Sequence, residues 1–338
     1  MINCAIIGLG QIGYKIDQDP LRNIIWSHAK TYFTHDKVNF VAVSDINEKN
    51  YIDFNQYYNG IDFCNNYVSM ISEYDIDIVS ICTPNNTHYE IIRDILQHHQ
   101  PKAIFLEKPM GSNLSEGKSI IELCEKKGVV LAINYMRRWE EKYIYIKKII
   151  DEKKYGELKS ITAFGCTSLL TSTSHLIDLF LYFGGKVDWI IGELQEDYIR
   201  NVNGVNDPGG IAFTKFSNNG YGYIKGTSID SKHYMFELDL LFANGRIRIS
   251  DDGRSISEWS FYENNTSTGS GYMNLQRIPN DNFFVQNERM ISAVDDIIFC
   301  INNKSKPKSN GYNALDVHKF IDAIKNSPTN QNHKVSII

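Results

Sequence analysis

The chain opens with a short apolar run that glycines interrupt. Residues 2–7 are mostly apolar and too few for an independent helix, and Gly8, Gly10 and Gly13 follow with the spacing G-x-G-x-x-G. This order predicts a strand, a tight turn and the start of a helix. Gly8 would let the chain turn, Gly10 would let backbone approach a diphosphate, and Gly13 would let the helix pack on the strand. Amide groups at that helix start favour a bound phosphate.

A second predicted strand over 38–45 ends in Asp45, the position that reaches the adenosine ribose of a dinucleotide. A carboxylate there repels a 2′-phosphate, so we expect NAD, with NADP disfavoured. Gly13 and Asp45 are 45 − 13 = 32 residues apart, whereas the usual fingerprint has about 20. An insertion therefore lies within residues 14–33. It either carries part of the site or is a surface loop without function.

The insertion has its own local signals. Asp17 and Pro20 interrupt the helical pattern, and Ser27 is a suitable N-cap for the helix that resumes after it. We expect this loop to leave the carboxyl edge of the sheet, beside the cofactor.

The next segments alternate between strands and helices. Strands are predicted at 76–84, 102–109 and 129–136, and helices at 87–99 and 115–127, the second closed by Gly128 as its C-cap. Repeated β-α units with short connections indicate a doubly wound parallel sheet, a Rossmann domain over residues 1–135.

Residues 136–338 show a different pattern. We expect a helix over 137–154 that ends at Gly156, and an apolar helix around His175. Alternation of apolar and polar residues then predicts strands of an open-faced, largely antiparallel sheet with one buried face. These strands lie at 211–216, 220–229, 234–243 and 245–252. The fold class is therefore α/β, with a Rossmann domain followed by an α+β domain for substrate binding and oligomerisation.

Three further expectations concern the end of this domain. Asn244 and Gly245 would form a two-residue hairpin turn. Residues 264–271, rich in Asn, Ser, Thr and Gly, would be an exposed loop. Helices are expected over 287–302 and 314–326.

Composition limits the partners. The 338 residues, 42% of them hydrophobic, exceed a single domain of roughly 100 to 200 residues. The net charge of −5, with both signs interspersed, favours neither nucleic acid nor an anionic membrane. The six cysteines lack C-x-x-C spacing, so we expect reduced thiols and no metal site. We identify neither a signal peptide nor an apolar stretch of the roughly 18 residues that span a membrane, and expect a cytoplasmic protein.

Segments along the whole chain resemble the glucose-fructose oxidoreductase, inositol dehydrogenase and MocA (Gfo/Idh/MocA) family of NAD(P)-dependent oxidoreductases. They are GLGQIG, VAVSD, CTPNNTHYE, LEKPM, NYMRRW, SHLIDL, LLFANGRIRI and residues 313–337. Each segment alone is a weak signal, and their common order is a strong one. The resemblance implies hydride transfer between nicotinamide and a polyhydroxylated small molecule, in a homodimer or homotetramer.

Two residues are candidates for catalysis. Lys108 ends a predicted central strand, where its ammonium would reach a substrate oxygen, and the resemblance implies that a cis peptide precedes Pro109. The resemblance also implies that His175 is the acid/base, although a lone histidine in an apolar helix is more often a core residue. Asp178, three residues later, would share a helix face with it and bind substrate or orient the imidazole.

One position departs from the family. Thr171 occupies the place where the family commonly has an aspartate, four residues before the histidine. A threonine cannot balance an imidazolium charge. Three alternatives follow: Lys108 takes a larger share, another acidic group substitutes, or the substrate binds differently.

The remaining site residues follow from the resemblance. Tyr135 and Arg138, with Arg137 beside it, would contact substrate or brace the domain junction, and Thr171 would line the substrate site. Predicted cofactor contacts are Gly8, Gly10, Gln11, Ile12, Gly13, Asp45, Thr83, Pro84, Asn85, His88, Glu107 and Lys108.

The expected activity is NAD-dependent oxidation or reduction at a hydroxyl or carbonyl carbon of a sugar, sugar derivative, nucleotide sugar or cyclitol. Two alternatives remain open: a glycosidase that uses NAD in a redox-neutral cycle, and an NAD-binding protein without turnover.

Overall fold

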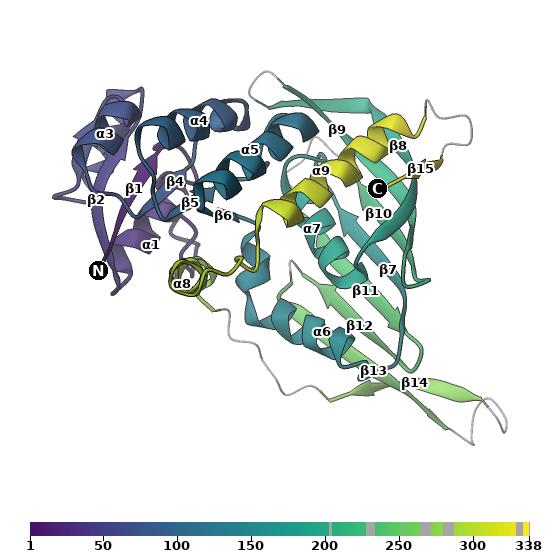
Figure 1. Cartoon of the computed structure of the whole chain (residues 1–338). Helices are drawn as coiled ribbons and strands as arrows, with labels where there is room; N and C mark the ends of the chain where they lie inside the picture. The colour runs from purple at the N-terminus through teal and green to yellow at the C-terminus, as the bar shows by residue number, and fades with distance from the viewer. Residues whose placement is uncertain are drawn as a thin grey trace. The chain divides into compact units, whose positions relative to one another are not determined.

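The computed structural model describes residues 1–202, 205–227, 234–251, 253–263, 272–279, 287–328 and 334–337. They belong to two compact units, one formed by 1–141 with 286–318 and the other by 142–285 with 319–338 (Figure 1). The expected boundary at residue 135 lies near the first break at 141. A single boundary could not include the later segment 286–318, which returns to the first unit.

The first unit contains a six-stranded sheet in which every strand pair is parallel, in the order β3-β2-β1-β4-β5-β6. Its strands are β1 (Ile2–Ile7), β2 (Val38–Ser44), β3 (Asp62–Cys64), β4 (Ile78–Ile81), β5 (Ala103–Leu106) and β6 (Val130–Ile133). Strands β4 and β5 are buried at every residue, as expected for a sheet covered on both faces. The predicted doubly wound sheet is confirmed. The short strand β3 was not predicted.

Helices cover both faces of this sheet. α3 (Tyr67–Glu73), α4 (His88–His98) and α5 (Leu114–Lys127) line one face, whereas α1 (His28–Thr34) and α8 (Arg289–Asn303) lie on the other (Figure 1). The short helix α2 is Glu48–Phe54.

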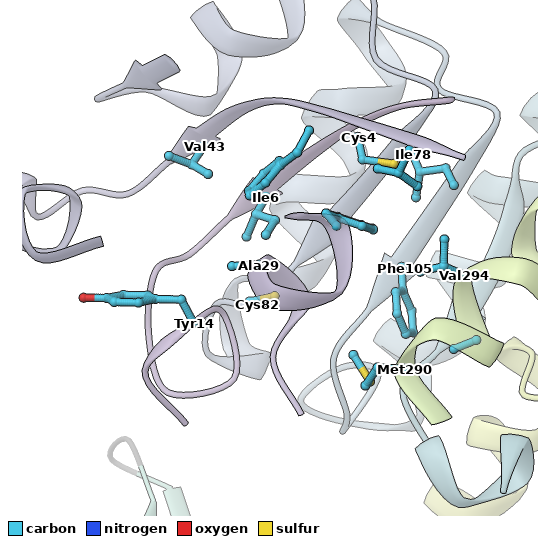
Figure 2. Packing of buried hydrophobic residues seen from close by; sticks show 14 of the residues in the cluster. Cys4, Ile6, Tyr14, Ala29, Val43, Ile78, Cys82, Phe105, Met290 and Val294 are labelled. Atoms are coloured by element: carbon cyan, nitrogen blue, oxygen red, sulfur yellow. The ribbon is translucent and has the colours of Figure 1, made fainter. Parts of the chain in front are cut away.

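Helix α8 has a specific packing role, because the β4-β5-β6 crossovers place their helices on the opposite face. Met290 and Val294 of α8 pack in the same core as Phe105 of β5 (Figure 2). A helix from late in the chain therefore covers the apolar face that local connections leave open.

The insertion interrupts the first helix after one turn. Tyr14 N donates to Gly10 O over 3.2 Å, and the chain then leaves through a 3₁₀ turn, η1 (Lys15–Gln18). The helical ladder resumes across the gap, since His28 N donates to Ile12 O over 3.1 Å and Ala29 N to Gly13 O over 2.9 Å.

The predicted cap at Ser27 is confirmed, because its side chain accepts from Lys30 N. Asp17 holds this cap, accepting from Ser27 N over 2.8 Å and from Ser27 Oγ over 2.7 Å. The returning end of the loop is thus anchored to its beginning.

The second unit contains a nine-stranded sheet with the order β14-β13-β12-β11-β7-β10-β9-β8-β15. Only β7 and β10 pair in parallel among the strand pairs of the described residues, so the largely antiparallel sheet is confirmed. The strands are β7 (Leu158–Gly165), β8 (Val187–Val202), β9 (Val205–Phe216), β10 (Tyr221–Gly226), β11 (Phe236–Phe242), β12 (Gly245–Ser250), β13 (Ser255–Glu263), β14 (Met273–Ile278) and β15 (Lys334–Ser336).

Helix α7 (Ser172–Gly184) packs on one face of this sheet. Phe180 of α7 lies 5.1 Å from Phe216 and 5.7 Å from Phe320, ring centre to ring centre. A Cβ at Gly222 of β10 would overlap the Phe180 ring, so glycine is what permits this close approach. Phe320 belongs to α9 (Gly311–Asn326).

Some local expectations need correction. The helix predicted over 137–154 is two elements, η3 (Met136–Trp139) and α6 (Glu141–Asp151), separated at the extended residue Glu140. The predicted turn is displaced by one residue, because Gly245 already belongs to β12, where a Cβ would come 2.6 Å from Trp259 O. Glycine there makes room for a neighbouring strand.

Three other features bear on the expectations. The loop expected at 264–271 lies outside the described residues. Among the helices that are described, none is long and apolar enough to cross a membrane. All six cysteines are free, and five of them are buried.

Candidate functional site

The three glycines after β1 differ in what surrounds them. A Cβ at Gly8, whose φ is +98°, would come 2.9 Å from the Cys82 carbonyl carbon, and one at Gly13 would overlap the Gly8 carbonyl oxygen. A Cβ at Gly10 would meet no protein atom within 4 Å. Protein packing therefore requires Gly8 and Gly13, whereas Gly10 lies against open space. This is the glycine to which the fingerprint assigns close approach of a diphosphate.

Asp45 is held beside this turn. Its Oδ2 accepts from Leu9 N over 2.6 Å, and its Oδ1 accepts from Asn47 N over 2.8 Å and from Asn50 Nδ2 over 3.2 Å. Three donors keep the carboxylate at the end of β2, in the position that the fingerprint assigns to ribose recognition.

The loop after β4 carries the next predicted group. Thr83 Oγ1 accepts from Thr87 Oγ1 over 2.8 Å, and Asn85 Nδ2 reaches Gly111 O over 3.5 Å, while Pro84 is exposed. Gln11 is exposed and Ile12 is half-buried in the glycine turn. These residues line the carboxyl edge, where open α/β sheets bind ligands.

His88 differs from its neighbours because its side chain is inaccessible. Its Nδ1 lies 3.1 Å from Pro109 O and its Nε2 lies 2.9 Å from Thr83 O, with the ring at 0% exposure. A neutral ring can donate to one of these carbonyls, and an imidazolium to both. Burial lowers the pKa of His88, more than the carbonyls and Glu107 raise it. The geometry thus places His88 between two loops of the site and gives it no surface to offer a ligand.

Glu107 and Lys108 lie at the end of β5. Lys108 is half-buried, the Lys108–Pro109 peptide is cis as expected, and Lys108 N donates to Glu107 Oε2 over 3.3 Å. Glu107 Oε1 accepts from Asn134 Nδ2 over 2.5 Å and lies 3.0 Å from His28 Nε2. Burial raises the pKa of Glu107, but bonds and charge from His28, with Asn134 and Lys108, outweigh it and leave that pKa below its ordinary value.

The segment after β6 supplies basic and aromatic groups. Tyr135, Arg137 and Arg138 are all buried, at 1%, 5% and 6% exposure. The main chain is held there by Tyr135 O, which accepts from Arg138 N over 3.1 Å. Burial of two arginines indicates bracing within the unit, and their predicted substrate contacts stay predictions.

The other predicted residues lie in the second unit, on and before α7. Thr171 is the N-terminal flanking residue, and its Oγ1 donates to Ser168 O over 3.0 Å. His175 and Asp178 are buried in the same helix, at 7% and 1% exposure. Thr171 thus closes a local turn through its hydroxyl, a role that a threonine can fill.

A buried carboxylate lies next to this turn. Asp207 of β9 is 1% exposed, and its Oδ1 accepts from Leu170 N over 2.9 Å, one residue from Thr171. Sequence reasoning missed Asp207 because it is 32 residues beyond His175 and lies before the start of the strand predicted at 211–216. It also missed Asn134 and His28, whose roles depend on adjacent strand ends.

Residues from five strand ends of the first unit therefore meet at one edge of the sheet. They follow β1, β2, β4, β5 and β6, all parallel, so their carboxyl ends share that edge. The open side of Gly10 and the buried Asn134 Oδ1, which has no hydrogen-bond partner in the described part of the chain, both fit a bound dinucleotide. No three His, Cys, Asp or Glu side chains of the described residues form a metal-ligand group.

Comparison with known proteins decides the family. A model of the Gfo/Idh/MocA family, described as an oxidoreductase family with an NAD-binding Rossmann fold, matches residues 2–135. An uncharacterized protein of Haemophilus influenzae is 34% identical over 93 residues, which are 28% of this chain and 90% of that protein. The chain belongs to the Gfo/Idh/MocA oxidoreductase family.

Relatives of this Gfo/Idh/MocA protein include enzymes of known activity. The scyllo-inositol 2-dehydrogenase (NADP(+)) IolW of Bacillus subtilis is 34% identical over 89 residues, 26% of this chain and 24% of that enzyme. The NAD(+) scyllo-inositol 2-dehydrogenase of the same organism is 29% identical over 159 residues, 46% of this chain and 42% of that enzyme. The chain thus matches less than half the length of either enzyme.

Solved structures share the fold over the whole chain. The WlbA dehydrogenase of Bordetella pertussis, in complex with NADH and UDP-GlcNAcA, has a TM-score of 0.79 at 18% identity and covers 100% of this chain and 99% of that one. A putative myo-inositol dehydrogenase of Sinorhizobium meliloti has a TM-score of 0.76 at 18% identity, with full coverage of both. The α/β class with its second, sheet-containing unit is therefore the fold of this family member.

Proposed function

We propose that this protein is an NAD-dependent dehydrogenase of a polyhydroxylated small molecule. The observation that carries the proposal is the glycine turn, in which packing accounts for Gly8 and Gly13 but leaves the Cβ direction of Gly10 open. Glu107 and Lys108 at the end of β5 then lie on the sheet edge where the nicotinamide end of a dinucleotide would bind.

The reaction needs three events at one carbon. NAD bound at this edge would supply the hydride acceptor for conversion of a secondary alcohol to a carbonyl. Lys108 holds the substrate oxygen through its ammonium and stabilises the negative charge that develops as the hydroxyl proton leaves. His175 accepts that proton, and it returns it when the carbonyl is reduced.

Asp207 would supply the charge that Thr171 cannot. It is the buried carboxylate bonded to Leu170 N, directly before the helix that carries His175. An anion in that position favours the protonated imidazole formed during oxidation. Of the three alternatives that the departure at Thr171 leaves open, substitution by another acidic group is the one that this observation favours.

We propose NAD as the preferred cofactor because of Asp45. Its carboxylate is held by Leu9 N, Asn47 N and Asn50 Nδ2, and such an anion repels the 2′-phosphate of NADP. The relatives include an NADP-dependent and an NAD-dependent enzyme, so family membership alone does not decide the preference.

A sugar, sugar derivative, nucleotide sugar or cyclitol is the proposed substrate class. Support comes from the scyllo-inositol dehydrogenases among the relatives and from the sugar nucleotide bound in the WlbA structure. Net formation of NADH distinguishes a dehydrogenase from both alternative functions. A redox-neutral glycosidase would release no net NADH, and a binding protein without turnover would bind NAD and reduce none.

The test starts with cofactor binding to two glycine variants. Gly10→Val should fold normally, since a Cβ at this position meets no protein atom within 4 Å, but weaken NAD binding by at least about tenfold in calorimetry. Gly13→Ala should instead lose thermal stability. Wild-type affinity in Gly10→Val would contradict the proposed site. A screen of sugars, cyclitols and nucleotide sugars, followed by NADH absorbance in both directions, then identifies the substrate class.

A further inference from the structure

A line of buried hydrogen bonds runs behind Glu107. Tyr32 Oη lies 2.6 Å from Ser80 Oγ, which lies 2.7 Å from His28 Nδ1, and His28 Nε2 lies 3.0 Å from Glu107 Oε1. Ser80 and His28 are both at 0% exposure. The line crosses from α1, through β4, to the end of β5, where Asn134 donates to the same carboxylate oxygen.

The direction of each bond follows from the carboxylate. Glu107 Oε1 accepts from Asn134 Nδ2 and Glu107 Oε2 accepts from Lys108 N, so both oxygens of the carboxylate act as acceptors. His28 must therefore donate from Nε2. In a neutral ring Nδ1 then accepts from Ser80, and Ser80 Oγ accepts from Tyr32. Each polar hydrogen in the line has one acceptor.

The line contains a serine, a histidine and a carboxylate, the residue types of a hydrolytic triad, but its serine is not accessible to a substrate. Ser80 lies inside β4, buried at every residue, and the Tyr32 hydroxyl occupies its outer side. No substrate carbonyl can reach a serine in that position. The histidine therefore acts on the carboxylate, and the serine holds the histidine.

Glu107, oriented by His28, in turn orients the backbone of the next residue, Lys108. Its Oε2 accepts from the backbone N–H of Lys108, so orienting the carboxylate orients the peptide from which the lysine side chain leaves. The carboxylate also places a negative charge beside that side chain. His28, 79 residues before Glu107, thereby acts on Lys108, the residue that would hold the substrate oxygen.

We propose that His28 is a positioning residue for Lys108, acting through a directed hydrogen bond to Glu107. The effect on catalysis rests on the proposed function, but the hydrogen bonds that carry the inference all lie within the first unit. The insertion takes part, because Asp17 holds Ser27, the residue directly before His28. The loop within residues 14–33 thus has a structural connection to the site.

The kinetic test compares three variants of the full-length protein. His28→Leu removes the donor and should lower kcat by about tenfold or more, with NAD affinity within about twofold. His28→Gln keeps an N–H donor and should recover part of that loss. Thr31→Val is the matched control, because Thr31 is equally buried in α1 but its hydroxyl donates to Ser27 O and not to the line behind Glu107, and it should lose stability without losing kcat.

A double-mutant cycle separates positioning from general destabilisation. If His28 acts through Glu107, Glu107→Gln should cost little further kcat in the His28→Leu background, where the donor is gone. Additive losses, or a wild-type kcat in His28→Leu, would overturn the proposal. If His28→Leu does not fold, the same cycle with His28→Gln should still give losses of kcat that are less than additive, and additive losses would overturn the proposal.

A second readout needs no turnover. Reductively methylated ¹³C-lysine gives an NMR signal for Lys108, which Lys108→Arg assigns by its disappearance. His28→Gln should move that signal and Thr31→Val should not, whether or not NAD binds. An unmoved signal contradicts the positioning role, whereas a wild-type protein that reduces no NAD with any substrate contradicts the proposed function instead.

Discussion

Lys108 combines a strand-end position with a buried carboxylate neighbour. Half-buried beside Glu107, it has the location that charge stabilisation at a substrate oxygen requires. Lys108→Ala should lower kcat by about a hundredfold to a thousandfold and leave NAD affinity nearly unchanged. Stopped-flow NADH formation and calorimetry measure the two quantities. A mutant with normal turnover would remove Lys108 from the mechanism.

Asp45 is the residue that should decide cofactor preference. Asp45→Ser removes the anion held beside the glycine turn and should narrow the ratio of kcat/KM for NAD over NADP by about tenfold. Glu48→Ser, a change at the first residue of α2, is the control for net charge. Unchanged discrimination in Asp45→Ser would contradict the assignment.

His88 gives a pH dependence of stability. Its native pKa lies below the ordinary value of 6.5, because burial disfavours the charged ring. Between those two pKa values the unfolded chain binds more protons, so the contribution of His88 to the free energy of unfolding is lost as pH falls below about 6.5. Urea unfolding from pH 5 to 8 should show the wild-type advantage over His88→Gln shrinking toward acid. A constant difference would contradict this.

Single site residues could be predicted from the sequence where one short segment contains the whole motif. The sequence alone identifies the glycine spacing, Asp45 after a strand and Lys108 before Pro109. The structure places all of them on one edge of the sheet. Asn134 and His28 were not predictable, since each becomes significant only when separate segments bring it to Glu107. The motif identified His88 from the sequence, but it could not show that the ring is enclosed between two carbonyl oxygens.

At the scale of elements, the inserted loop is the main departure from a regular Rossmann unit. His28 N donates to Ile12 O, the bond that residue 16 would make in an unbroken helix, so the insertion amounts to 28 − 16 = 12 residues and 32 − 12 = 20 residues remain between Gly13 and Asp45. That value returns to the usual fingerprint of about 20. The spacing anomaly could be read from the sequence, but the split of a helix could not.

The anchoring of that loop is testable. The charged carboxylate of Asp17 accepts hydrogen bonds from Ser27 and from Trp26 N. Asp17→Asn keeps the shape of the side chain but removes the charge and replaces one accepting oxygen with an amide group that can only donate. It should lower kcat by a few-fold through His28 and reduce stability by about 1 kcal/mol. Asp19→Asn, at the exposed side of the same loop, should change neither. Thermal unfolding and steady-state rates distinguish the two variants, and identical behaviour of both would contradict the anchoring role.

At the scale of the whole molecule, the second unit leaves aromatic side chains uncovered on its sheet. Phe213 is 43% exposed, stacks on Tyr221 at 5.8 Å and lies 5.7 Å from Trp189. Such a patch is typical of a surface that pairs with another copy of the same chain. The alternation along β9 could be read from the sequence, but the alignment of these rings across three strands could not.

We expect this face to mediate homo-oligomerisation. Phe213→Lys should shift the protein to monomers in light scattering after size exclusion, because a desolvated charge opposes association. Phe299→Lys on α8, at a site 59% exposed, is the matched control and should leave the oligomer intact. A wild-type monomer, or an unaffected Phe213→Lys oligomer, would contradict the assignment.

Helix α8 also determines when the first unit can finish folding during synthesis. The ribosome must add 288 − 141 = 147 residues after residue 141, where the first segment of the unit ends, before Arg289, the first residue of α8, is made. At roughly 5 to 20 residues per second this takes roughly 7 to 30 s. Throughout that interval the nascent sheet exposes the surface around Phe105, so chaperone engagement should peak before α8 emerges from the ribosome.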